Sequence, residues 1–182
     1  MNGLRQSSSR AILILALLLA PGLSRPSFAQ SPALPVPPAL PAQLISVAEA
    51  HAIIEGANAY AREKNLRLGV VVLDTSGEMV AGEHMDGAPG RNIQFAEGKA
   101  FAAVMYRTTS ETMSELYKTQ PARYFGIMNM YGNKIYLVGG GVPIAVDGKL
   151  IGAVGVSGSN QDEAAAQAGI AAWEKVRASL RK

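Results

Sequence analysis

Residues 139–158 read GGGVPIAVDGKLIGAVGVSG, in which an Asp-Gly pair at 147–148 separates two runs rich in β-branched side chains. Asp-Gly in such a setting is a strong hairpin signal, because a type I′ turn needs φ > 0 at both central residues. The second run is interrupted by Gly152 and Gly155, so each face of that strand lacks one side chain. The stretch therefore predicts an antiparallel hairpin whose second strand is approached closely by a packed helix or a flat ligand.

A helix is predicted directly after this hairpin. Ser159 is followed three residues later by Asp162, a pattern that can cap a helix start. Alanines then recur with helical spacing at 165, 168 and 172. We expect a helix from about residue 161 to about residue 178.

The elements upstream of the hairpin follow from the same kinds of signal. Ser46 and Glu49 form a capping box before an amphipathic run. The predicted helices lie at 47–64, 92–106 and 110–118, the predicted strands at 69–73, 78–84 and 135–138, and a long loop at 119–134. Because tight turns between neighbouring strands require antiparallel pairing, the predicted fold class is α+β, a five-stranded antiparallel sheet packed with helices.

The first 43 residues are predicted to stand outside this domain. Residues 1–29 combine Arg5 and Arg10, an apolar run of about ten residues and a Ser-Phe-Ala sequence, which is typical of a secretory signal peptide. A membrane anchor is the alternative, although a span takes roughly 20 apolar residues. Residues 30–43 are rich in proline and predict an extended linker, or else a docking motif. The folded domain is expected at 44–182, in the periplasm or secreted.

Charge and composition exclude several classes of partner. The chain has 17 Lys+Arg against 14 Asp+Glu, and three of the arginines lie within residues 1–29, which leaves 14 of each sign. A net charge near zero offers no electrostatic footprint for nucleic acid or for an anionic membrane. There is no cysteine, so stability must come from a core and not from disulfides.

The familiar catalytic motifs do not explain the sequence. The triple glycine at 139–141 resembles a phosphate-binding loop, but strand-forming residues follow it where a helix would be required. No nucleophile with a neighbouring base is visible, which argues against a hydrolase and leaves open whether the protein is an enzyme.

Several motifs, in one order, resemble the signature of the GlcG/HbpS family of heme-binding-type proteins, which includes a domain of some cobalamin adenosyltransferases. They lie at residues 140–144, 147–148, 151–158, 162 and 168–170, preceded by Met85-Asp86-Gly87-Ala88 and Lys99-Ala100. The resemblance covers about residues 44–178. It implies a profilin-like fold, homo-oligomers and, in the characterised branch, heme binding with heme degradation. Other branches accompany glycolate or diol metabolism.

Two histidines are candidates for the axial ligand that heme iron requires, since cysteine is absent. His84 stands at the end of the second predicted strand, where the family pattern usually has arginine. It is the candidate metal ligand, and the alternative is a solvent-facing polar group. His51 lies beside the apolar face of the first helix and is more typical of a helix-surface histidine.

The resemblance makes Lys99 a candidate partner for a heme propionate, and the alternative is an ordinary surface lysine. Ala102 falls where the family often has a small polar residue, which weakens transfer of the heme-degrading activity. The predicted cofactor site, shallow and between subunits, comprises His84, Lys99, Gly139, Gly140 and Gly141.

The segment 119–134 also carries side chains suited to a ligand. It contains Tyr124, Phe125, Met128, Met130 and Tyr131. Aromatic and thioether groups suit a flat apolar ligand, and they suit a subunit interface equally well. The Met128-x-Met130 spacing is also a weak indication of a soft-metal site.

Together these features predict an exported, homo-oligomeric heme-binding protein with a role in heme sequestration, sensing or degradation. The alternative from another class is a non-heme accessory protein that binds a small organic acid or a partner enzyme. A third reading is weak heme-dependent catalysis.

Overall fold

The computed structural model describes residues 44–180, so the predicted signal peptide and linker lie outside the described residues. The elements, in chain order, are α1 (Val47–Glu63), β1 (Gly69–Leu73), β2 (Met79–His84), α2 (Asn92–Tyr106), α3 (Ser110–Ser114), α4 (Leu116–Thr119), α5 (Pro121–Tyr131), η1 (Gly132–Lys134), β3 (Gly141–Val146), β4 (Lys149–Ser157) and α6 (Asp162–Leu180). None of the helices described is both long and apolar enough to cross a membrane.

The sheet holds four strands in the order β2-β1-β4-β3, and every neighbouring pair is antiparallel. In register, Val72 of β1 and Val142 of β3 both pair with Val154 of the central strand β4. The α+β class is therefore confirmed, whereas the prediction of five strands is wrong within the described residues.

The missing strand is the segment 135–138, which runs along helix α2 instead of joining the sheet. The amide of Tyr136 donates to the carbonyl of Gly98 in α2 at 3.0 Å. Ile135 and Leu137 are buried in a cluster with Ala102. The alternation of apolar residues was thus a correct sign of one buried face, but a helix and not a strand covers that face.

The hairpin prediction is confirmed. Asp147 and Gly148 connect β3 to β4 and have φ values of 51° and 75°, as a type I′ turn requires. At Gly155 a Cβ would collide with the carbonyl oxygen of Ala96 and lie 2.8 Å from the amide nitrogen of Ala100. The close approach to this strand therefore comes from helix α2, not from a ligand.

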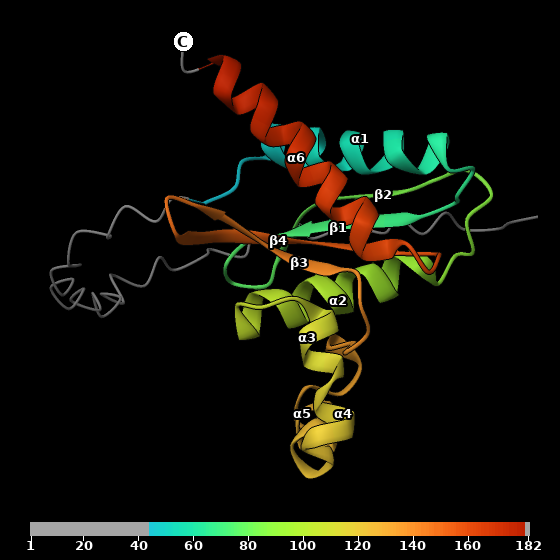
Figure 1. The fold of residues 1–182 in the computed structure, drawn as a ribbon, viewed down its shortest axis with the longest axis vertical. Helices are drawn as coiled ribbons and strands as arrows, with labels where there is room; N and C mark the ends of the chain where they lie inside the picture. The colour runs from blue at the N-terminus through green and yellow to red at the C-terminus, as the bar shows by residue number, and fades with distance from the viewer. Residues whose placement is uncertain (1–43, 181–182) are drawn as a thin grey trace, which may run out of the picture. The chain divides into compact units, whose positions relative to one another are not determined.

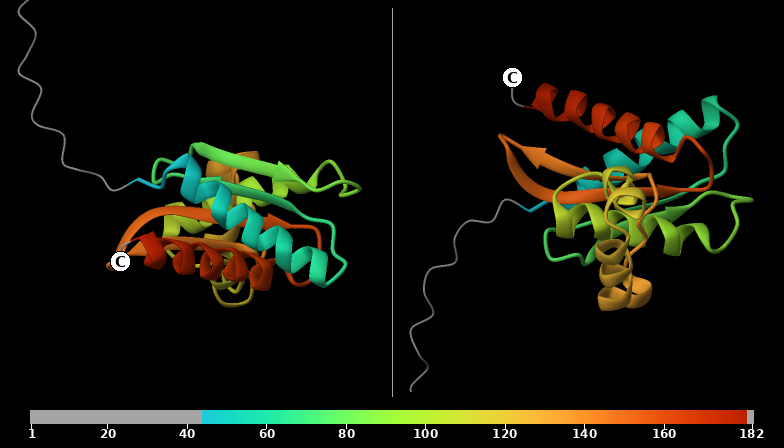
Figure 2. Two further views of the ribbon diagram at one scale, coloured as in Figure 1. Left: turned by 90° about the horizontal axis from the view of Figure 1, so that it is seen from above. Right: turned by 60° about the horizontal axis from the view of Figure 1, so that its bottom comes forward.

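Helices cover both faces of the sheet. Figure 1 shows α1 and α6 on one face and α2 on the other. Figure 2 shows α1 and α6 running beside each other, and small residues let them touch, since a Cβ on Gly56 would lie 2.6 Å from that of Ala172. Val154 and Val156 face the α1–α6 layer, and Val71 and Ala153 face α2.

The predicted capping residues form hydrogen bonds at the start of the first helix and just before the last helix. Ser46 and Glu49 form a complete capping box at the start of α1. At α6, the amide of Ser159 donates to the Asp162 carboxylate at 2.8 Å.

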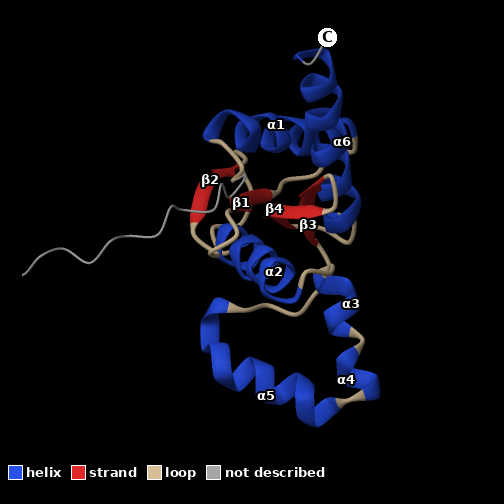
Figure 3. Ribbon diagram, turned by 90° about the vertical axis from the view of Figure 1, so that its left-hand side faces the viewer, coloured by secondary structure: helices blue, strands red, loops and turns tan. Residues whose placement is uncertain are grey.

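The long loop predicted at 119–134 is wrong, because this segment is helical. Helix α5 begins at Pro121, whose fixed φ and missing N–H suit the first turn of a helix. The predicted helix at 110–118 is divided into α3 and α4. Figure 3 shows α3, α4 and α5 projecting away from the sheet on the α2 side.

Candidate functional site

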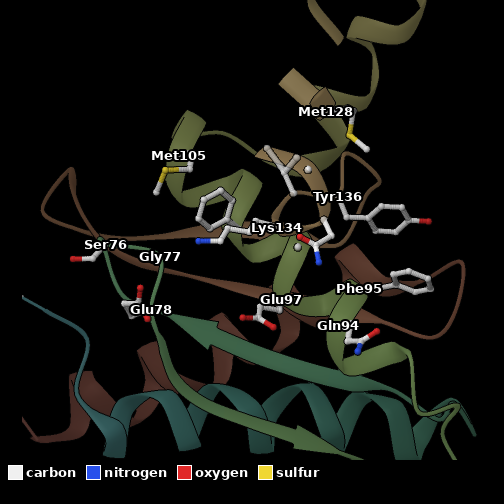
Figure 4. Close-up of a pocket in the computed structure, with 15 residues that line it drawn as sticks. Ser76, Gly77, Glu78, Gln94, Phe95, Glu97, Met105, Met128, Lys134 and Tyr136 are labelled. Atoms are coloured by element: carbon white, nitrogen blue, oxygen red, sulfur yellow. The ribbon is translucent and has the colours of Figure 1, made fainter. Parts of the chain in front are cut away.

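A cleft of about 870 Å³ lies between the β1–β2 turn, helix α2 and the chain from Met128 to Tyr136. We call it the aromatic cleft (Figure 4). Its apolar lining consists of Phe95, Phe101, Met105, Met128, Ile135 and Tyr136. Its volume lies within the range of small-molecule and cofactor sites.

One wall of the aromatic cleft is a stacked pair. The rings of Phe95 and Tyr136 are 4.8 Å apart between centroids and inclined by 23°. Phe101 lies about two turns further along α2. Its ring meets that of Tyr131 edge to face, with 5.5 Å between the ring centroids. Flat ligands stack on such surfaces, and aromatic pairs of this geometry hold each other in place.

Two glycines make room for this arrangement. A Cβ on Gly98 would lie 2.9 Å from the Cβ of Tyr136, so glycine lets the 135–137 segment approach α2. Gly77, in the β1–β2 turn, has a φ of +84°, and a Cβ there would lie 2.9 Å from the ring of Phe101. Larger residues at either position would push the walls apart.

Charged groups occur only at the rim of the aromatic cleft. Glu78, Glu97 and Lys134 line it and are exposed. Among its described lining residues, Lys134 is the one cation available to an anionic group of a ligand.

Lys99, the predicted propionate partner, is instead buried. Its Nζ lies 2.6 Å from Oδ2 of Asp162 and donates to the carbonyl of Val156 at 3.1 Å. The two side chains are only 3% and 8% exposed. This ion pair ties α2, the end of β4 and the start of α6 together, and we call it, with Gly140 and Gly141, the Lys99 junction.

The glycines at 140 and 141 fit around this lysine. Gly140 has a φ of +120°, and a Cβ on it would lie 2.5 Å from the carbonyl of Val156 and 3.2 Å from Cδ of Lys99. The amide of Gly141 donates to Oγ of Ser110 at 2.8 Å, and that hydroxyl donates to Val138 O at 2.6 Å. The predicted glycine edge therefore closes the Lys99 junction instead of forming an open binding loop.

A smaller pocket of about 400 Å³ borders Gly139 and is acidic. It is lined by Glu111, Val138, Gly139, Ser159, Asn160, Asp162 and Glu163. Burial, reinforced by the nearby charge of Glu111, raises the pKa of Glu163, against a hydrogen bond from the Gly140 backbone. Such a pocket repels carboxylates, which argues against it as a seat for an organic acid.

The histidines lie away from both regions. His84, exposed at the end of edge strand β2, places Nε2 3.0 Å from the carbonyl of Pro89. Strands β1 and β4 separate it from Gly141 on β3, which is three strand spacings or about 14 Å across the sheet. His51 is exposed on α1. Within one protomer, Lys99 and Gly139–Gly141 come together and His84 does not, so its ligand role stays a prediction.

The described residues contain no group of three or more His, Asp or Glu side chains placed to hold a metal ion. The two methionines of the Met128-x-Met130 motif also diverge, since positions i and i+2 do not share a helix face. Met128 lines the aromatic cleft, whereas Met130 is 78% exposed.

The sequence matches a known protein family. The model of the family described as haem degrading protein HbpS-like matches residues 45–171. The chain belongs to the HbpS-like family.

Individual relatives agree with the family and the fold. Protein GlcG of Escherichia coli is 29% identical over 114 residues, which is 63% of this chain and 81% of GlcG. Protein ORFY of Klebsiella pneumoniae superposes with a TM-score of 0.70 at 25% identity, over 76% of this chain and 97% of ORFY. The crystal structure of a PduOC:heme complex superposes with a TM-score of 0.65 at 29% identity, over 71% and 94% of the two chains.

Sequence reasoning missed most of the aromatic cleft. It identified Met128 as a possible ligand contact but not Phe95, Phe101, Met105 or Tyr136. The available signal was Gly98 inside a predicted helix, because an interior glycine indicates a close backbone approach. The i, i+4 pair of Phe101 and Met105 pointed to a second apolar face of the same helix.

Proposed function

We propose that this protein is an exported, homo-oligomeric heme-binding protein, and that the aromatic cleft is the seat of the heme. One observation carries the proposal. The cleft joins a stacked aromatic wall to thioethers and a rim cation in a chain that is 29% identical to a relative crystallised with heme.

The residues of the aromatic cleft fit a tetrapyrrole. A macrocycle is flat and apolar over most of its area, and Phe95, Phe101 and Tyr136 offer aromatic surface to it. Its propionates need a cation at the edge, where Lys134 is exposed. Lys99 is the weaker candidate for that contact, since its ammonium is already satisfied by Asp162 and Val156.

Bound heme would supply one-electron and oxygen chemistry, which is the cofactor's own. The contribution of this chain is to hold the ring, orient it and limit access of water. Phe95 and Tyr136 hold a face of the ring, and Lys134 fixes its direction of entry. Sequestration of heme requires no more than these functions.

Export follows from residues 1–29 and would place the protein in the periplasm or outside the cell. Expression in a bacterial host followed by fractionation and N-terminal sequencing tests this part. A chain beginning at Gln30 in the periplasmic or extracellular fraction is expected, and retention of Met1 in the cytoplasm would contradict it.

An accessory role through a protein partner is the second candidate function. It is favoured by Tyr117, Phe125 and Met130 on α4 and α5, which are 60%, 58% and 78% exposed. The same surface could serve a second copy of the chain. Analytical ultracentrifugation of wild type and of a Phe125→Ser variant distinguishes the two. An oligomer that Phe125→Ser dissociates indicates self-association, and a monomeric wild type leaves the surface to another protein.

The test of heme binding is a hemin titration followed by the Soret absorbance. Wild type should bind saturably and stoichiometrically. Phe95→Ala should weaken the affinity at least about fivefold, because it removes half of the stacked wall. Phe125→Ala, which removes an exposed phenylalanine outside the cleft, is the matched control and should leave the affinity unchanged. A shift no larger than that of an unrelated protein would refute the proposal.

A further inference from the structure

The aromatic cleft is lined by two methionines from separate elements. Met105 comes from the last turns of α2 and Met128 from α5, and both are half-buried. A Cβ on Gly77 would lie 3.5 Å from the terminal methyl of Met105, which puts that thioether at the β1–β2 turn. Figure 4 shows the two methionines at separate positions along the cleft.

The donor atoms in the aromatic cleft are restricted. Heme iron takes His, Cys, Met or Tyr as axial ligands. The chain has no cysteine, and His51 and His84 lie outside the cleft lining. Its donors of these types are therefore the two thioethers and the phenol of Tyr136.

Tyr136 is held by contacts with other side chains. Its ring stacks on Phe95 and lies 6.0 Å from the ammonium of Lys99. Figure 4 shows its hydroxyl directed away from Met105. Turning this ring to bring its oxygen toward Met105 or the middle of the cleft would break the stack with Phe95.

We propose that heme iron in this protein is ligated by a methionine thioether of the aromatic cleft, from Met105, Met128 or both, and not by histidine. The inference rests on the proposed heme-binding function. Thioether ligation favours the ferrous state and raises the reduction potential of heme. The protein would accordingly hold heme in the reduced, ferrous form more readily than a histidine-ligated protein does.

The test uses leucine variants, since Met→Leu keeps nearly the same volume while removing the sulfur. Ferric hemin complexes of wild type, Met105→Leu, Met128→Leu and the double variant are compared by near-infrared absorption and by redox titration. Met130→Leu is the matched control, because it removes an exposed thioether two residues from Met128 on the same helix. His84→Ala is measured alongside.

The expected result is a sulfur-to-iron charge-transfer band in wild type that is lost in the double variant, together with a fall in reduction potential. Met130→Leu and His84→Ala should keep the band, and the single variants assign the ligand. A stoichiometric Soret band that depends on His84, or a phenolate spectrum lost in Tyr136→Phe, would overturn thioether ligation while heme binding stands. If wild type shows no saturable Soret shift, the proposed function itself has failed.

Discussion

Helix α2 contributes to two regions of opposite character, the Lys99 junction and the aromatic cleft. In the Lys99 junction the ammonium, the carboxylate and the glycines satisfy one another and exclude solvent. In the aromatic cleft, Phe101 and Met105, which lie two and six positions after Lys99 on the same helix, face an open cavity. Lys99, the charged residue that the sequence made a binding candidate, therefore stabilises the fold. The accessible site is built from side chains that belong to no recognisable sequence motif.

Lys99→Met should produce the largest loss of stability. It leaves Asp162 buried without its ion-pair partner, and breaking a buried pair costs about 3–5 kcal/mol. Urea unfolding measures this change in the free energy of unfolding. Adding Asp162→Asn should recover part of the loss, because it removes the unpaired charge while keeping an acceptor for Ser159. Wild-type stability in Lys99→Met would show that the Lys99 junction does not hold the fold.

Gly155→Ala tests the tight side of α2. The new Cβ would collide with the carbonyl of Ala96, and overpacking of this kind typically costs about 1–3 kcal/mol. Gly90→Ala is the matched control, since a Cβ there has nothing within 4 Å. Thermal unfolding should separate the two variants, and equal stabilities would mean that α2 is not packed as described.

The same packing explains which parts of the fold could be predicted from the sequence. The hairpin and the capping box of α1 were predictable because residues within a few positions of one another determine them. The segment 135–138 was misread because an alternating pattern reveals one buried face and not the element that covers it. The partner of Lys99 is 63 positions away at Asp162, a separation that no local pattern reports.

The segment 119–134 was misread for a related reason. Gly126 and Gly132 weaken its helical pattern. The helix is stabilised by packing of Ile127, with Tyr124, Met128 and Tyr131, against the cluster around Ala102 and Met113. The aromatic cleft depends on that helix and on the contact between Gly98 and Tyr136, both of which are tertiary features. The sequence contains the aromatic residues and methionines of the cleft, but no local pattern shows that they come together.

Glu163→Gln should change the pH dependence of stability at the edge of the Lys99 junction. Burial and Glu111 raise the pKa of Glu163 in the folded state, so ionisation of this group disfavours folding as pH rises through that pKa. The variant should therefore gain stability relative to wild type at neutral pH, and the difference should shrink toward about pH 4. Urea unfolding across this range measures it, and a difference that is independent of pH would contradict the assignment.

Gly126→Ala should give the smallest effect, and one of opposite sign. Gly126 lies inside α5 with nothing within 4 Å of a new Cβ, so alanine should stabilise the helix by about 0.5–1 kcal/mol. Hemin affinity should be unchanged, because Gly126 does not line the aromatic cleft. Calorimetry measures the stability, and the Soret titration measures the hemin affinity. A changed affinity would show that α5 moves when heme binds.

The position of the iron in a crystal of the heme complex tests the central claim most directly. Anomalous scattering at the iron edge locates the metal without any assumption about its ligands. We expect a single iron peak inside the aromatic cleft, between α2 and the 128–136 segment. A peak beside His84 on the β2 edge, or beside a Lys99 released from Asp162, would contradict it.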